Sequence, residues 1–340
     1  MNRPIPIDPP EPATISPLRG VGFFRLLNQC LPLGRKYHRF ISLINPASGL
    51  VAIPFGKFEV VHPASWGSEM AAILFQGEDL TPEFRLLPPI LAQLKHGHLV
   101  DVGANVGLYE LMLRANSPLP IIAYEPQPFL CDLVRRNVAH NRLDRVDVRL
   151  TACGSKRGEI SFHTGINGAV VPDRAADAGA SAADAGPVAP GPAAIDRQAD
   201  ATRHARPVIR VPVTTLDSDL DNQPVTLLKI DCEGFEHEIL AGAINLLEKQ
   251  RPHLLLELHP QEIEKLGGSP KQVLDCLRPF YDLEFWDFNL QRHYPKIVRS
   301  ALKHRRPKGH RLASEFEMLK ACEINPRPFQ LYVLGRPKNA

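Results

Sequence analysis

The stretch Val100-Asp101-Val102-Gly103-Ala104-Asn105-Val106-Gly107 decides the fold. An apolar run typical of a buried strand, His98 to Val102, ends in it, and a helical pattern starts at Gly107. Glycines at such a turn let the chain bend sharply and let a ligand approach the backbone, because a Cβ would obstruct both. By itself the turn is a weak signal, since ordinary strand-to-helix turns use the same residues.

Strands and helices alternate on both sides of this turn. The patterns predict strands over 98–102, 121–124, 146–150, 226–230 and 253–258, later strands near 282–288 and 330–335, and helices over 82–95, 107–115, 126–141, 235–250 and 260–277. Alternation at this spacing indicates βαβ units. We therefore expect residues 81–340 to form a Rossmann-like α/β domain with a doubly wound, mostly parallel sheet.

The residues before this domain have a different character. Residues 1–20 are rich in proline, which lacks a hydrogen-bond donor, and we expect a disordered tail. Residues 21–80 are expected to form a small β-rich lead-in. Its predicted elements are a helix over 21–40 and strands over 40–44, 50–55 and 58–62.

One insertion interrupts the alternation. Residues 166–207 consist mostly of alanine, proline, glycine and aspartate, which offer little to pack, so we expect a disordered loop. The flanking segments 158–163 and 208–213 have the pattern of strands. They can pair across the loop, because loop length adds closure entropy only slowly.

The composition excludes some function classes. The chain has 340 residues, 44% of them hydrophobic and 23% charged, with a formal net charge of +3. This is ordinary for a globular protein and gives no overall basic field for nucleic acid. The six cysteines form no Cys-x-x-Cys pair, and no apolar run is long enough for a membrane helix or a signal peptide. We expect a cytoplasmic protein without a transmembrane segment or a specific nucleic-acid partner.

Glu125 follows the predicted strand 121–124, about 20 residues past the glycine turn. There a carboxylate can accept hydrogen bonds from both ribose hydroxyls of an adenosine cofactor, although it can also be an exposed acid at a helix start. Asn105 stands where a dinucleotide loop has glycine, and it would crowd a pyrophosphate. Asp101 suits a cationic ammonium group. These residues favour S-adenosylmethionine over NAD.

Two carboxylates, Asp231 and Glu233, follow the predicted strand 226–230. Ligands of open α/β sheets bind at this edge, and Gly234 lets the chain turn close to a ligand. The two acids can take a proton from a hydroxyl or hold the sulfonium end of the cofactor. We place Asp231 near the methyl donor and Glu233 towards the acceptor. The alternative is that both cap the next helix.

Glu257 and His259 end the next strand, and their spacing puts both side chains on one face of the sheet. They can converge with Asp231 or Glu233. Histidine is a candidate general base for a hydroxyl, although a histidine before proline is also a common structural residue. The same Asp, Glu and His atoms could hold Mg²⁺, but we predict no metal site.

These motifs together resemble the FkbM family of methyltransferases. The resemblance covers about Gly77 to His259, through the motifs Asp101-Val102-Gly103-Ala104-Asn105-Val106-Gly107-Leu108-Tyr109, Tyr124-Glu125-Pro126, Lys229-Ile230-Asp231-Cys232-Glu233-Gly234-Phe235-Glu236 and Leu256-Glu257-Leu258-His259-Pro260. It implies a class I methyltransferase fold and O-methylation of sugars, polyketides or glycolipids. It also implies a cofactor site lined by Asp101, Gly103, Asn105, Gly107 and Glu125, with Ala152-Cys153-Gly154 as the turn that contacts adenine.

Other interpretations stay open at this point. NAD-dependent oxidoreduction shares the glycine turn and the acidic strand end, but Asn105 fits it poorly. A non-catalytic Rossmann module is a third class. The basic segment 299–311 can grip an anionic small-molecule or glycan acceptor, or it can be a solvated loop, which Pro307 and Gly309 favour. The aromatic residues near its start, Phe285, Trp286, Phe288 and Tyr294, are interpreted as packing groups.

Overall fold

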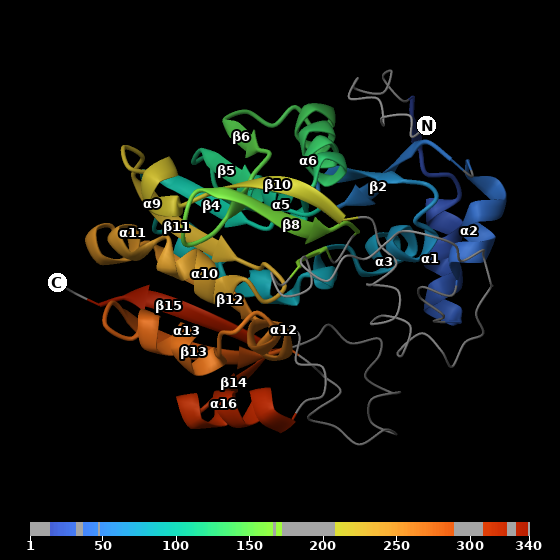
Figure 1. Ribbon diagram of the computed structural model, residues 1–340. Helices are drawn as coiled ribbons and strands as arrows, with labels where there is room; N and C mark the ends of the chain where they lie inside the picture. Colours follow the sequence, from blue (N-terminus) through green and yellow to red (C-terminus); the bar gives the residue numbers. More distant parts are fainter. Residues whose placement is uncertain are drawn as a thin grey trace, which may run out of the picture. The chain divides into compact units, whose positions relative to one another are not determined.

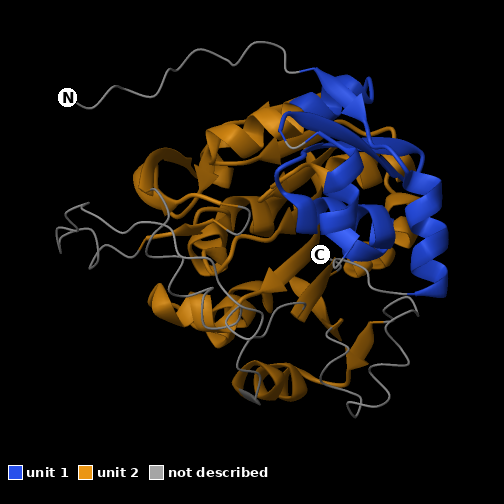
Figure 2. Ribbon diagram, turned by 90° about the vertical axis from the view of Figure 1, so that its right-hand side faces the viewer, with its two compact units in different colours: residues 1–81, 136–143 blue, residues 82–135, 144–340 orange. Residues whose placement is uncertain are grey.

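The computed structural model describes residues 14–31, 37–46, 48–165, 168–171, 208–288, 309–324 and 331–338. The chain divides into two compact units, residues 1–81 with 136–143 and residues 82–135 with 144–340 (Figure 2). The expected disorder of the tail and of most of the 166–207 insertion falls outside the described residues, as does the basic segment up to residue 308.

The second unit is built on an eight-stranded sheet (Figure 1). In spatial order its strands are β14 (His310–Leu312), β13 (Tyr281–Asp287), β15 (Leu331–Pro337), β12 (His253–Leu258), β11 (Val225–Ile230), β4 (His98–Val102), β5 (Ile121–Tyr124) and β6 (Val146–Arg149). The five strands from β12 to β6 are parallel, whereas β15 runs antiparallel to both its neighbours. The expected doubly wound, mostly parallel sheet is therefore confirmed.

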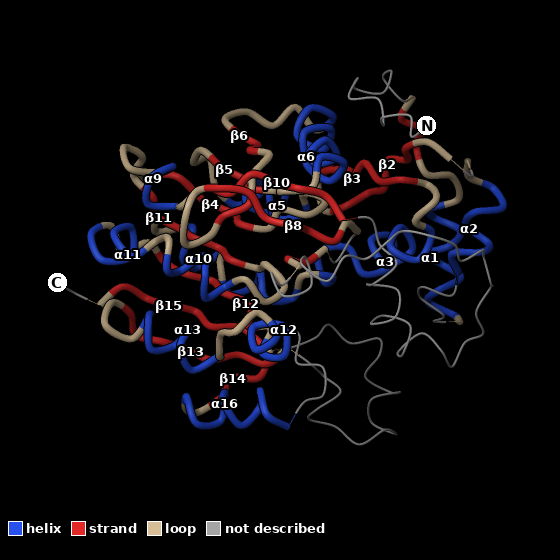
Figure 3. The backbone as a smooth tube through the Cα atoms, in the orientation of Figure 1, coloured by secondary structure: helices blue, strands red, loops and turns tan. Residues whose placement is uncertain are grey.

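Helices flank this sheet (Figure 3). They are the short α4 (Pro88–Leu91) and α9 (Leu216–Asp219), then α5 (Leu108–Asn116), α6 (Pro128–His140), α10 (Glu236–Ala241), α11 (Ile244–Lys249), α12 (Pro260–Lys265), α13 (Pro270–Leu277) and α16 (Glu315–Ile324). Among the described residues, no helix has both the length and the apolar character needed to cross a bilayer.

The two faces of the sheet differ in polarity. On one face, alternate residues of the central strands, such as Val100, Leu228 and Leu256, share a buried apolar cluster with residues of α9 to α13 and α16. Because neighbouring strand residues point to opposite faces, Asp101 and Lys229 lie on the other face, directly paired in register. The sheet therefore buries a polar layer on one side.

A second, smaller sheet in the same unit has the order β7-β10-β8-β9. Its strands are β7 (Ala152–Cys153), β8 (Gly158–His163), β9 (Ala169–Val170) and β10 (Val208–Thr214). Strands β8 and β10 are antiparallel, with Val208 opposite His163. This confirms the predicted pairing across the insertion.

The first unit contains helices as well as strands. Its elements are β1 (Ile15–Pro17), α1 (Val21–Cys30), α2 (His38–Ile44), β2 (Leu50–Phe55), β3 (Phe58–Pro63), α3 (Gly67–Gln76) and the 3-10 helix η2 (Gly77–Leu80). The predicted strand over 40–44 is wrong, since these residues belong to α2. The error has a physical reason, because a short apolar run suits a helix as well as a strand.

Three long helices predicted from periodicity are shorter or broken. The segment 82–95 forms the 3-10 helix η3 (Pro82–Leu86) and α4, with Pro88 at the start of α4. The segment 235–250 breaks at Gly242, where a Cβ would lie 2.0 Å from the Gly154 carbonyl oxygen. The segment 260–277 breaks at Gly267, whose φ is +86°. Glycine is tolerated in a helical pattern, so periodicity alone does not reveal such breaks.

The chain leaves β4 and β11 at the same edge of the sheet, and the two exits touch. Gly103, the first residue after β4, has φ +93°, and a Cβ on it would lie 2.0 Å from the carbonyl oxygen of Asp231. The amide of Asp231 donates to the carbonyl of Val102 over 3.1 Å. The two turns therefore form one backbone-to-backbone contact.

We predict that Gly103→Ala destabilises the protein more than Gly267→Ala. Both glycines have a left-handed φ, but nothing lies within 4 Å of a Cβ on Gly267. The control variant should lose about 1–2 kcal/mol from backbone strain alone. Gly103→Ala should lose about 1–3 kcal/mol more from crowding. Urea unfolding of both variants measures the difference, and equal losses would contradict the close contact.

Candidate active site

The turn after β4 combines three residues in the left-handed region. Their φ angles are +93° at Gly103, +55° at Asn105 and +86° at Gly107. Gly107 is the residue that precedes α5, where the chain must change direction. Only glycine adopts such angles without strain, apart from the short polar residues, so Asn105 is one of the few side chains tolerated here. The turn presents its backbone at the carboxyl edge of the sheet.

Glu125 closes one side of this turn. Its Oε2 accepts a hydrogen bond from the amide of Asn105 over 2.9 Å, and its Oε1 accepts one from the amide of Gln127 over 3.0 Å. The side chain is buried, which contradicts the alternative of an exposed acid at a helix start. Burial raises the pKa of Glu125 to about 7. Each carboxylate oxygen can accept further hydrogen bonds.

Lys229 and Asp101 form a buried ion pair beneath the turn. The Lys229 ammonium lies 2.9 Å from Asp101 Oδ1 and 3.6 Å from Asp231 Oδ2. It also donates to the Gly103 carbonyl over 3.2 Å and lies 4.5 Å above the Tyr109 ring. Burial alone would lower the pKa of Lys229, but the carboxylates of Asp101 and Asp231 raise it above its usual value. Asp101 was expected to face the ammonium group of a ligand, but in this structure it pairs with the ammonium of Lys229.

Residues of α5 and η3 extend this polar layer. The Tyr109 hydroxyl donates to Glu83 Oε1 over 2.6 Å, and burial raises the pKa of Glu83 to about 7. Glu110 is buried, and this burial, with the charge of Asp101, raises its pKa well above the usual range. The hydrophobic periodicity of the sequence does not single out Glu83 and Glu110, because the residues they interact with lie in other elements.

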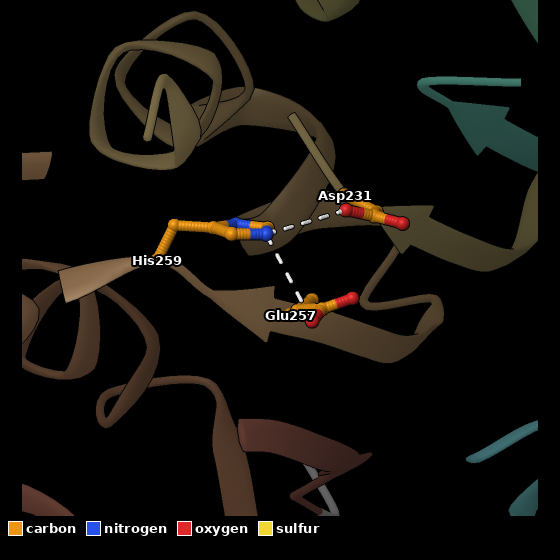
Figure 4. A group of neighbouring side chains, drawn as sticks. All are labelled: Asp231, Glu257 and His259. Carbon is orange, nitrogen blue, oxygen red and sulfur yellow. Dashed lines mark ion pairs between the residues drawn. The ribbon is translucent and has the colours of Figure 1, made fainter. Parts of the chain in front are cut away.

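Asp231, Glu257 and His259 come together at the ends of β11 and β12 (Figure 4). His259 Nε2 points at both acids, 3.8 Å from Asp231 Oδ1 and 3.8 Å from Glu257 Oε1. Glu257 and His259 are buried, whereas 32% of the Asp231 side chain is exposed. The structure therefore shows the convergence expected of these three residues, with Asp231 on the solvent side.

Two residues outside this group orient it. Glu236 Oε1 lies 2.6 Å from His259 Nδ1 and also accepts the amide of Gly234 over 3.1 Å. The Tyr332 hydroxyl donates to Glu257 Oε2 over 2.5 Å. Neither orienting residue was predicted from the sequence, although Glu236 lies within the motif that begins at Lys229.

These neighbours set the charges of the group. Burial, and after it the charge of Asp231, raises the pKa of Glu257 to about 8. Burial alone would lower the pKa of His259, but the carboxylates of Glu236 and Glu233 raise it well above the usual range. These carboxylates therefore favour the protonated form of the His259 imidazole.

The remaining predicted residues lie around this centre. Glu233 has φ +49° and is half-buried in the turn between β11 and α10. The alternative that Asp231 and Glu233 cap α10 is wrong, because Phe235 occupies that position and no side chain caps the helix. Ala152 is buried in β7 of the small sheet, and the amide of Gly154 donates to the carbonyl of Thr214 over 2.9 Å.

We predict that Lys229→Met costs about 3–5 kcal/mol of unfolding free energy, because it leaves the Asp101 charge buried without its cation. Lys249→Met, at the exposed end of α11, is the matched control and should change stability by about 0.5 kcal/mol or less. Adding Asp101→Asn to Lys229→Met should recover part of the loss. Denaturant titration measures all three, and a mild effect of Lys229→Met would contradict a buried ion pair.

Three solved structures to which the chain is similar are described as methyltransferases. The methyltransferase FkbM from Methylobacillus flagellatus KT is 18% identical over 64% of this chain and 50% of that chain, with a TM-score of 0.33. This chain thus matches half the length of that relative. A SAM-dependent O-methyltransferase from Thermotoga maritima is 10% identical over 76% of this chain and 66% of that chain, with a TM-score of 0.37. Precorrin-6y C5,15-methyltransferase from Geobacter metallireducens GS-15 is 10% identical over 75% and 89%, with a TM-score of 0.33.

No curated protein matches the chain significantly. The family model of the methyltransferase FkbM domain, however, matches residues 101–293, which is more than half of the chain. The match begins at Asp101 and includes the turn after β4, Glu125 and the group at the ends of β11 and β12. It confirms the expected resemblance to the FkbM family. The chain belongs to the FkbM family of methyltransferases.

Proposed function

We propose that the protein methylates a hydroxyl group of a sugar-containing, glycolipid or natural-product acceptor. The observation that supports this most is the convergence of Asp231, Glu257 and His259 beside the turn after β4. A hydroxyl is a poor nucleophile until its proton is removed, so an acceptor of this kind needs acid and base groups at the reacting oxygen. The group at the ends of β11 and β12 offers them.

The residues around the turn fit S-adenosylmethionine. Glu125 presents carboxylate oxygens at the turn, as ribose hydroxyls require, and Asn105 stands where a pyrophosphate would need open backbone. Gly103 and Gly107 allow the left-handed backbone angles of the turn. We propose that these residues bind the cofactor, with Ala152 and its turn next to adenine. Asp101 would not contact the cofactor directly but would hold Lys229, which donates a hydrogen bond to the Gly103 carbonyl of the turn.

When bound, S-adenosylmethionine supplies an electrophilic methyl group on a sulfonium centre, and the electron pair of the broken bond stays on sulfur. The chain's own task is to align the acceptor oxygen and to remove its proton. Asp231 suits this role because it is the exposed member of the group, so the proton passes from the hydroxyl to its carboxylate. The His259 imidazolium can donate to the same oxygen and hold it in line. Glu233 would face the rest of the acceptor.

We predict that Asp231→Asn lowers methyl transfer by about 10²- to 10⁴-fold, the usual contribution of a positioned base. Asp275→Asn, an exposed acid on α13, is the control and should leave activity unchanged. The assay incubates the protein with methyl-labelled S-adenosylmethionine and separate neutral sugars, nucleotide sugars, glycolipids and phenols. Mass spectrometry then looks for the gain of one methyl group.

The acceptor panel also tests the other classes. Methylation of amines or carbon acids with no hydroxyl product would contradict O-methylation. Cofactor binding without turnover on any acceptor would favour a non-catalytic module. A clear preference for nucleotide sugars over neutral sugars would support an anionic acceptor.

We predict that the affinity for S-adenosylmethionine rises with pH up to about 7. Burial raises the pKa of Glu125 to about 7, so the free protein carries this group largely protonated below that pH. Hydrogen bonds from ribose hydroxyls favour the ionised form, so binding releases a proton, and affinity should rise by at most about tenfold per pH unit. Above pH 7 the curve should level off.

Calorimetry between pH 5.5 and 8 measures this dependence. Glu125→Gln should bind more weakly at every pH and show no slope. Glu248→Gln, on the exposed side of α11, should keep both the affinity and the slope of the unmodified protein. A slope that survives in Glu125→Gln would mean that another group titrates.

A further inference from the structure

We propose that Asp231, Glu257 and His259 bind a divalent cation through two carboxylate oxygens and one imidazole nitrogen. The site itself is independent of the reaction. Its suggested use, to hold and activate the acceptor hydroxyl, rests on the proposed function.

The spacing of the three side chains fits a shared ion. One ligand atom from each lies within 4.8 Å of the other two. The distance of 3.8 Å from His259 Nε2 to each acid is too long for a hydrogen bond. Ions with bonds of about 2.0–2.2 Å hold their ligand atoms roughly 3–4 Å apart, so small side-chain shifts would complete the site.

His259 is already oriented as a ligand. It is 7% exposed, and its Nδ1 is held by Glu236, so Nε2 points into the group (Figure 4). Among the described residues, Nε2 makes no hydrogen bond. A carboxylate behind a metal-binding histidine is the usual arrangement, because it fixes the ring and raises its basicity. Glu236 is itself fixed by the amide of Gly234.

The two acids are oriented in a similar way. Tyr332 holds Glu257 by Oε2, while Oε1 is the oxygen that faces His259. Lys229 lies against Oδ2 of Asp231, while Oδ1 faces His259. The exposed part of Asp231 gives a hydrated ion a route from solvent. Positions not taken by protein ligands would be filled by water or by the acceptor oxygen, whose pKa the ion would lower.

The donor set indicates which ion to test. Two carboxylates favour Mg²⁺ and Mn²⁺, whereas imidazole favours later first-row metals. Mn²⁺ accepts both donor types and is detected directly by electron paramagnetic resonance, so it is the first probe. A proton on His259 Nε2 would compete with the ion, because the protonated imidazole has no lone pair left for a metal.

The experiment titrates Mn²⁺ into the full-length chain without cofactor or acceptor, and follows free Mn²⁺ by electron paramagnetic resonance. Mg²⁺ and Zn²⁺ are tested by calorimetry. We expect one Mn²⁺ per chain and at least a tenfold loss of affinity in His259→Gln and Glu257→Gln. Glu236→Gln should lose about 10- to 100-fold, the usual effect of removing the group behind a metal ligand. His253→Gln, at the opposite end of β12, should bind as the unmodified protein does.

Circular dichroism establishes that each variant is folded. Because Asp231 is partly exposed, Asp231→Asn is the variant for which we expect the smallest effect on folding. It should also bind Mn²⁺ more weakly. The proposal would be overturned if none of the three ions bound stoichiometrically. It would also be overturned if an ion bound but none of these variants weakened its binding.

The outcomes separate this site from the proposed function. Hydroxyl methylation by a protein that binds none of the three ions in the titration would overturn the cation site and leave the proposed function in place. Mn²⁺ binding that follows the variants, with no hydroxyl acceptor methylated, would support the site and count against the function.

Discussion

The buried ammonium of Lys229 is the interaction on which the site depends. It sits on the sheet face that α5 covers, where an unpaired charge would be very unfavourable, so it must stay between Asp101 and Asp231. These acids belong to β4 and to the turn after β11. The same ammonium holds the carbonyl of Gly103. One cation therefore links the turn after β4 to the turn after β11.

Acids outnumber bases around this cation. Glu83 and Glu257 have a pKa raised towards neutrality mainly by burial, and the charge of Asp231 raises both further. Each is held by a tyrosine hydroxyl, from Tyr109 and Tyr332. Such a region can relieve its excess negative charge by taking up protons or by binding a positive ligand. The sulfonium of the cofactor and a divalent cation both meet that requirement, which is why the two proposals draw on one electrostatic feature.

Much of the fold could be predicted from the sequence. Strands β4, β5 and β12 begin and end at the predicted residues, because apolar runs bounded by glycine, proline or charged residues leave little choice. Helix breaks at Gly242 and Gly267 were not predicted, since glycine also occurs within helices. The break at Gly242 depends in addition on what lies opposite the glycine. At Gly242 that is the carbonyl of Gly154, a contact between segments far apart in the sequence.

The convergence of Asp231, Glu257 and His259 followed from the rule that parallel strands end at one edge. Lys229, Glu83 and Glu236 were missed because their roles depend on partners in other elements. The sequence nevertheless contains a feature from which the role of Lys229 could be predicted. It interrupts the apolar run of β11, and a lysine that is buried in a central strand requires a carboxylate on the same face of a neighbouring strand. Asp101 interrupts β4 in the same way, and the register of the two strands places them opposite each other. Charged residues inside buried strands can therefore indicate strand register from the amino-acid sequence alone.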